Sequence, residues 1–265
     1  MIFRSVSTAL SVIYTAKKYM VIGIDTLALM YISKNTNSDN VLLVLQNILV
    51  LYDKEQELQD TCPTAPQLDF TGTSTRLGME DNLRLNKTGI ERISRQCFHI
   101  IDKNAKKVLE SDEFEDISLD LLKDIIRRDS LHLPSELCVW QALYRWSHRQ
   151  CRRRHLSPSL ANKREVLEGA QYHVRYLTMT YQHFKVASSL LTKEEEDSIL
   201  YNLLHMESSL TQSIKEYQVS MNTPRHRAGG LWKHVWRKKV QNNQTKKDKM
   251  TLAEQIFFFI VCILD

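Results

Sequence analysis

The sequence predicts an all-α protein, and three observations support that prediction. The 265-residue chain contains only seven glycines, where an average usage near 7% would give about eighteen. Apolar residues recur every three to four positions over much of the chain, which is the period of one helix face. The links between most of these stretches are short, as they are in a helical bundle or a stack of helix pairs.

The first helices are predicted on either side of a polar turn. Residues 8–32 show helical spacing of apolar side chains, and the polar run Ser33–Asn40 follows them. Ser38 or Asp39 is a plausible N-cap for the next helix. That helix starts with the strongly apolar segment Val41–Leu51 and ends in the charged sequence DKEQELQD.

Residues 62–92 are expected to form an irregular insertion. The stretch from 62 to 78 holds two of the five prolines and two of the seven glycines, a composition typical of loops. Its length exceeds the usual connection between helices, which favours an inserted segment or a flexible lid.

Regular structure is expected to resume at Ile93, with apolar residues at 93, 97, 101, 105 and 108 on one helix face. After a break at DEFEDIS, the next helix buries Leu121, Leu122, Ile125 and Ile126. It ends at Arg127-Arg128-Asp129, where the arginines suit the negative end of the helix dipole.

The following helix opens at Pro134, since proline is tolerated in a first turn. Val139, Leu143 and Trp146 follow helical spacing, and Leu137, Trp140 and Tyr144 widen the apolar arc. So broad an arc predicts the centre of a helical core. Two more helices are expected, over Asn162–Tyr176 and from a capping box at Thr192 and Glu195 to about Met206.

No residue pattern indicates catalysis, a cofactor or a metal. The cysteines at 62, 97, 138, 151 and 262 show neither close pairing nor metal-ligand spacing, and are expected to be reduced thiols in an intracellular protein. His148 and Cys151 could share a helix face, but a lone pair of this kind is more often coincidence. Glycine-rich phosphate loops are absent. We therefore expect a protein that is not an enzyme.

Positive charge is concentrated near the C-terminus. Nine Lys/Arg and one acid lie between Arg225 and Lys249, so this segment carries +8 and the remainder of the chain −3. Such a stretch could contact phosphates or an anionic surface, although charge runs are more often solvated tails. The basic residues singled out are Arg225, Arg227, Lys233, Arg237, Lys238 and Lys239.

The apolar segment Ile256–Leu264 has nine residues, whereas a membrane-spanning helix needs about twenty. No transmembrane segment is therefore predicted.

Several of these segments together carry a family resemblance. YTAKKYMV at 14–21 resembles the closing helix of a BTB (POZ) domain. The stretch from Cys97 to Trp146 is similar to the first half of a BACK domain, with an IID segment, F-x-D-I, L-x-x-I-x-R-R, S-E and A-L-x-x-W in that order. Asn162–Phe184 resembles its continuation. The nearest resemblance is to BTB-BACK proteins that end in a PHR β-sandwich, although no PHR domain is recognisable.

The resemblance implies a BACK-like bundle of antiparallel helix pairs, preceded by the terminal helices of a BTB domain. Residues 1–34 would be the end of the BTB domain, and 35–61 a helix pair resembling the cullin-binding 3-box. After the insertion at 62–92, the BACK domain would span 93–206, and a basic tail with a short apolar end would cover 207–265.

The function that the resemblance implies is that of a non-catalytic adaptor or scaffold in a cullin-3 RING ubiquitin ligase, with the BACK domain as a helical spacer. Cullin-3 and a ubiquitination substrate would be the partners, in the cytoplasm or nucleus, and dimerisation would require a full BTB domain. Residues expected to contact cullin or other parts of the chain are Val41, Leu42, Val44 and Leu45. Simple packing against neighbouring helices is the alternative for these residues. A basic helical protein that binds nucleic acid or chromatin through Arg225–Lys249 is the less favoured alternative function.

Overall fold

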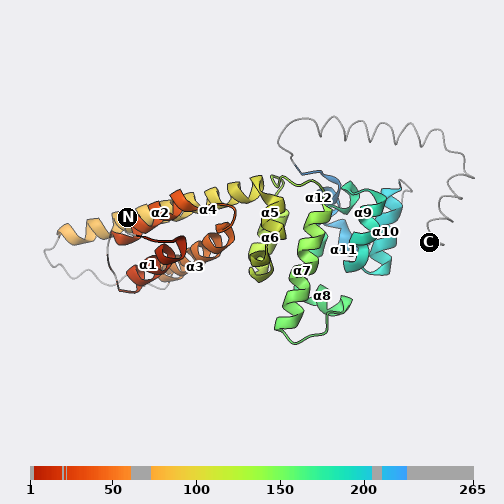
Figure 1. Cartoon of the computed structure of the whole chain (residues 1–265), viewed down its shortest axis with the longest axis horizontal. Coiled ribbons are helices and arrows are strands. Elements are labelled where there is room, and N and C mark those ends of the chain that lie inside the picture. Colours follow the sequence, from red (N-terminus) through yellow and green to blue (C-terminus); the bar gives the residue numbers. More distant parts are fainter. Residues whose placement is uncertain (1–2, 20, 22, 61–72, 205–210, 226–265) are drawn as a thin grey trace, which may run out of the picture. The chain divides into compact units, whose positions relative to one another are not determined.

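The computed structural model describes residues 3–19, 21, 23–60, 73–204 and 211–225. Every regular element in this part of the chain is a helix (Figure 1), which confirms the predicted all-α class. The buried apolar side chains form one cluster that runs from Phe3 to Met221. A compact unit spans Met1–His226, so residues 211–225 belong to the folded part, not to a tail that begins at 207.

Four helices form the N-terminal part: α1 (Val6–Lys18), α2 (Ile24–Asn35), α3 (Val41–Asp60) and α4 (Thr73–Lys103). Gly23 separates α1 from α2 with a φ of 94°, a left-handed conformation that glycine adopts at no steric cost. Helix α1 packs on α2, and α4 packs on both α2 and α3. The predicted N-cap is wrong, because α3 begins only after Asn40 and the Asn37 side chain accepts from the backbone of Asp39 and Asn40.

The expectation of an irregular segment up to residue 92 is wrong from Thr73 onward, where α4 begins. The C-terminal half of α4 buries Ile90, Ile93, Cys97 and Ile101. Once that half is fixed by packing, each added residue extends the helix at little cost, because nucleation is the expensive step. Gly89 favours the packing, since a Cβ there would lie 3.3 Å from Leu29 Cδ1.

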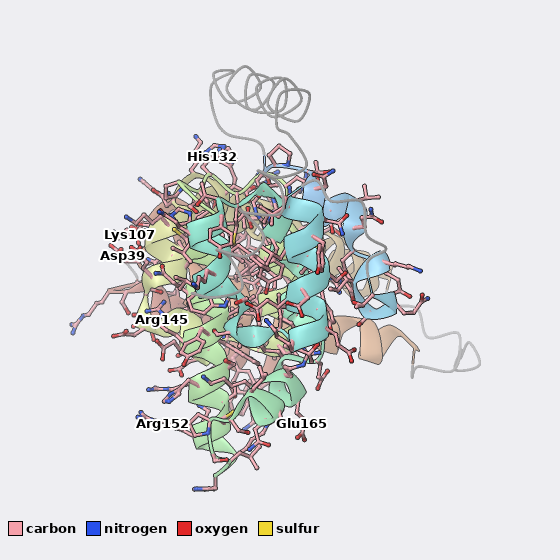
Figure 2. All side chains as sticks on the ribbon, turned by 90° about the vertical axis from the view of Figure 1, so that its right-hand side faces the viewer. Asp39, Lys107, His132, Arg145, Arg152 and Glu165 are labelled. Carbon is pink, nitrogen blue, oxygen red and sulfur yellow. The ribbon has the colours of Figure 1, made fainter. Side chains whose placement is uncertain are left out.

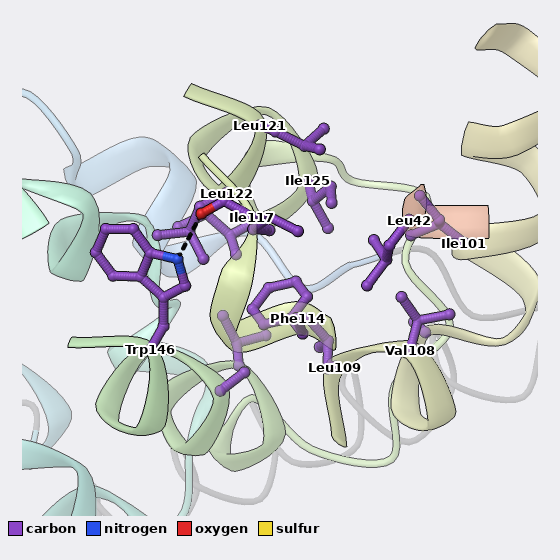
Figure 3. Packing of buried hydrophobic residues seen from close by; sticks show 14 of the residues in the cluster. Leu42, Ile101, Val108, Leu109, Phe114, Ile117, Leu121, Leu122, Ile125 and Trp146 are labelled. Atoms are coloured by element: carbon purple, nitrogen blue, oxygen red, sulfur yellow. Dashed lines mark hydrogen bonds between the residues drawn. The ribbon is translucent and has the colours of Figure 1, made fainter. Parts of the chain in front are cut away.

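The central part consists of α5 (Ala105–Glu110), the 3-10 helix η1 (Asp112–Asp116), α6 (Leu119–Arg127), α7 (Leu137–Arg153) and α8 (Leu160–Leu167). Helix α7 contacts α5, η1, α8 and α9, which confirms its predicted place at the centre of the core. The predicted apolar face of α6 is buried, and so is that of α7 except for Leu137 and Tyr144, which are half-buried. The Trp146 indole N–H donates to the Ile117 carbonyl at 3.0 Å (Figure 3).

The C-terminal part consists of short elements: η2 (Ala170–His173), η3 (Tyr176–Thr178), α9 (Tyr181–Ala187), η4 (Ser188–Leu190), α10 (Lys193–Leu203), α11 (Gln212–Lys215) and α12 (Gln218–Asn222). The helix predicted over 162–176 ends at Leu167, because Glu168 and Gly169 adopt positive φ angles. The predicted capping box at the start of α10 is present, with both reciprocal hydrogen bonds between Thr192 and Glu195.

Candidate partner-binding surface

Helix α3 carries the four residues that the sequence singled out for partner or intramolecular contact. Val41, Leu42, Val44 and Leu45 are all buried. Leu42 belongs to the same core as Ile101 and Val108 (Figure 3). In this structure the four side chains therefore make intramolecular contacts and are not accessible to another protein.

The opposite side of α3 is apolar and exposed. Leu43 and Val50 have 41% and 53% of their surface accessible, and with exposed Asn47 they stand at i, i+4 and i+7, one face of a helix. These three residues are termed the outer face of α3. Sequence reasoning missed this face, although Gln46 and Asn47 are the only polar residues in the apolar run and indicate which side meets water.

Exposed apolar side chains are concentrated in the N-terminal helices. Of the ten large apolar side chains exposed among the described residues, seven lie between Tyr14 and Val50. The other three, Leu160, Val186 and Val219, are scattered along the rest of the chain, as single surface hydrophobics commonly are. Exposed apolar surface, the kind that protein contacts use, is therefore concentrated between Tyr14 and Val50 among the described residues.

The start of α3 is attached to the central helices by polar contacts. Lys107 on α5 lies beside Asp39 (Figure 2) and forms an ion pair with it at 2.5 Å. The Lys107 ammonium also donates to the Ser38 hydroxyl at 3.1 Å. The hydrogen bond and charge of Lys107 lower the pKa of the Asp39 carboxyl, but both groups are exposed, so the pair adds little stability. The Gln46 amide donates to the Asp116 carbonyl on η1 at 3.4 Å. Burial of Leu42 therefore contributes more than these contacts to holding α3 in place.

A buried carboxylate joins the end of α4 to the turn after α6. Arg128 donates to both oxygens of Asp102, at 2.8 and 2.6 Å, and the Ser130 hydroxyl donates at 2.7 Å. Burial alone would raise the pKa of the Asp102 carboxyl, but the hydrogen bonds and the charge of Arg128 lower it more strongly. The carboxylate is therefore ionised and paired over the whole physiological pH range.

The described cysteines and the most perturbed histidine lack the features of catalytic groups. Burial raises the pKa of the Cys97 thiol to about 12 and also raises that of Cys151, so neither provides a thiolate at neutral pH. Burial and nearby cations lower the pKa of His173 to about 4. Its ring accepts a hydrogen bond from Arg127 at 3.0 Å. Within the described residues, no three His, Cys, Asp or Glu side chains gather as they would around a metal.

The basic residues singled out in the C-terminal stretch have different positions. Arg225 is buried, and its guanidinium pairs with Glu136, so it is not free to contact a phosphate. The remaining five, Arg227, Lys233, Arg237, Lys238 and Lys239, lie outside the described residues, as does the apolar segment Ile256–Leu264. In the part of the chain that the structure describes, no helix is both long and apolar enough to cross a bilayer.

Comparison with known proteins identifies relatives of the chain. It is 37% identical over 110 residues to the BTB/POZ domain-containing protein 6-A of Danio rerio, a match covering 40% of this chain and 20% of that protein. It is 28% identical over 195 residues to the BTB/POZ domain-containing protein 6 of Xenopus tropicalis, covering 72% of this chain and 30% of the relative. The BTB/POZ domain-containing protein 3 of Homo sapiens is 34% identical over 110 residues, a match covering 40% of this chain and 21% of that protein.

The aligned parts thus span between a fifth and a third of these relatives. No solved structure matches the chain. The model of the BACK family (BTB And C-terminal Kelch) matches residues 86–186, the region that contains the second half of α4, the buried Asp102 and the central helix α7. Residues 86–186 therefore match the BACK family, and the chain is similar to BTB/POZ domain-containing proteins.

Proposed function

We propose that this protein is a non-catalytic adaptor related to the substrate adaptors of cullin-3 RING ubiquitin ligases, acting in the cytoplasm or nucleus. The match of residues 86–186 to the BACK family and the similarity to BTB/POZ domain-containing proteins support the adaptor role. The observation that carries the proposal is the continuous core from Phe3 to Met221, which joins the helices with exposed apolar surface to the BACK domain. An adaptor needs such a connection to hold one partner in a defined position relative to another.

In this proposal the BACK domain is a helical spacer. Helix α7 has 17 residues, which at 1.5 Å per residue corresponds to about 26 Å. Helix α7 is packed on several sides by α5, η1, α8 and α9. Its direction is therefore set by contacts with these elements. A spacer of this kind transmits a fixed distance and orientation.

Cullin-3 contact is proposed for the outer face of α3, not for the four residues that first suggested it. Leu43 and Val50 are exposed, whereas Val44 beside them is buried. Two apolar side chains seven residues apart, about two turns of an α-helix, can insert into a groove of another helical protein. They form a small patch, so binding would need further surface from a BTB domain.

The test measures binding to the N-terminal region of cullin-3 by isothermal titration calorimetry. We expect weak or undetectable binding for residues 1–265 alone, and robust binding when the BTB domain of a relative is joined upstream. In that fusion, Leu43→Asp should weaken binding by at least about tenfold. Leu160→Asp, an equally exposed leucine on α8, is the matched control and should bind normally. A fusion that folds but fails to bind refutes the cullin-3 assignment.

A further inference from the structure

Arg225 lies in a buried environment near the end of the described chain, where its guanidinium makes four hydrogen bonds. Only 3% of its side chain is exposed, and 8% of that of its partner Glu136. Its Nε donates to Glu136 Oε1 at 2.7 Å and its Nη2 to Oε2 at 3.3 Å. The remaining N–H groups reach the carbonyls of Arg128 and His173. The guanidinium therefore connects three segments far apart in sequence.

A second buried arginine holds the same terminal segment from the other side. Arg175 donates through Nη1 to the Thr223 carbonyl at 2.6 Å, and its Nη2 pairs with Asp129. Its backbone N–H also reaches Glu136. Thr223 is thus bound to Arg175 just before η3, and Arg225 is bound to groups at the end of α6 and the start of α7.

Apolar contacts anchor the rest of this segment. Ile214 and Met221 are completely buried, and the Tyr217 ring lies 5.3 Å from that of Tyr172 and 5.1 Å from that of His173. Helices α11 and α12 have only four and five residues. Helices so short do not form on their own, so their presence depends on these contacts.

We propose that residues 211–225 are a strap that closes the BACK domain, and that Arg225 is the latch that fixes the C-terminal end of this strap against the start of α7. The family model ends at residue 186, yet the packed chain continues to Arg225. Glu136 immediately precedes α7, so the described chain ends beside the start of the central helix and not at the end of α10. This inference concerns the BACK domain itself and does not depend on cullin-3 binding.

The attachment of the strap through Arg225 should weaken when either member of the Arg225–Glu136 pair is replaced. Removing one member of a buried ion pair leaves an uncompensated charge, whereas removing both leaves none. Glu136→Gln and Arg225→Gln should therefore each release the strap, and the double variant should release it less than either single change.

The test is amide hydrogen exchange of the full chain, read out by mass spectrometry on peptides from 211–224. In the unmodified protein we expect these peptides to be protected, and Arg225→Gln should accelerate their exchange by about tenfold or more. Peptides from α1 and α2 should be unchanged. Arg152→Gln, an exposed arginine on α7, is the matched control and should leave the strap protected.

Arg225→Lys is a second variant in case the glutamine variant loses protection throughout the chain. Lysine keeps the charge but not the planar fork that reaches Glu136 and the carbonyls, so a smaller acceleration confined to the strap is expected. Unprotected 211–224 peptides in the unmodified protein would overturn the proposal. So would protection that neither Arg225→Gln nor Arg225→Lys changes.

Discussion

Replacing Trp146 by phenylalanine tests how the centre of the BACK domain is held together. Trp146 is 2% exposed, and its indole N–H is bonded to the Ile117 carbonyl at 3.0 Å. Phenylalanine fills most of the volume but cannot donate. The Ile117 carbonyl would be left unpaired among apolar side chains, at a cost of about 1–3 kcal/mol. With the small cavity that remains, we expect the free energy of unfolding to fall by about 2–3 kcal/mol.

Trp140 provides a matched comparison on the same helix. It is also mostly buried, at 8% exposed, but its indole N–H has no hydrogen-bond partner among the described residues. Trp140→Phe removes a buried donor that is already unsatisfied, which offsets part of the cavity cost. We expect a net change within about 1 kcal/mol, smaller than that of Trp146→Phe.

The assay is equilibrium unfolding in urea followed by far-ultraviolet circular dichroism. The free energies of unfolding of the two variants are compared if their m-values equal that of the unmodified protein. A larger loss for Trp140→Phe than for Trp146→Phe would refute the hydrogen-bond reasoning. The two alanine variants test burial itself. Each should lose about 3–5 kcal/mol, and a loss below about 1 kcal/mol would mean that the side chain faces solvent.

Three further predictions concern single side chains. Because Arg128 lowers the pKa of Asp102, the stabilisation from this carboxylate is complete above its unfolded pKa of about 3.9 and is lost as the pH falls through the lower folded value. Asp102→Asn should therefore lower the urea midpoint at pH 7, and the difference in midpoint from the unmodified protein should become smaller in acid. A difference in midpoint that does not depend on pH would contradict this reasoning. Val44→Asp buries an unpaired charge on α3 and should lower the free energy of unfolding by more than about 3 kcal/mol. Leu43→Asp on the outer face should lower it by under about 1 kcal/mol. Equal losses of stability in thermal unfolding would show that the two faces are misassigned. Glu195→Gln removes the charge that pairs with half-buried Arg164 at 2.7 Å but keeps a side chain that can complete the capping box. It should therefore destabilise the protein by about 2 kcal/mol, and a loss under about 0.5 kcal/mol in urea unfolding would contradict the importance of the pair.

The helix faces of the BACK domain were predictable because one period governs both sequence and packing. Leu122, Ile125, Val139 and Leu143 are buried as their spacing indicates. The period says less about where a helix stops. Glu168 takes a left-handed conformation with φ 45°, which glutamate rarely adopts, so the only local indication that α8 ends there is the Gly169 that follows.

Contacts between distant segments were beyond sequence reasoning. Arg225 looked like one cation in a basic stretch, since its partner Glu136 is 89 residues away. The orientation of α3 was ambiguous for a different reason. Nine of the eleven residues from Val41 to Leu51 are apolar, so the polar residues Gln46 and Asn47 were the only indication of which side of the helix is exposed.

The shared core has a consequence for how adaptor activity should be tested. A change such as Trp146→Ala lies far in sequence from α3, so any effect on cullin-3 binding would have to act through folding or through the geometry of the spacer. If the free energy of unfolding is about 8 kcal/mol, a variant that lowers it by about 4 kcal/mol still has roughly a thousand folded molecules for each unfolded one. Loss of folded protein would then change the apparent affinity by less than about 1%. A large drop in binding by such a variant would therefore report an altered position of α3 relative to the BACK domain, which is the property that a spacer must keep constant.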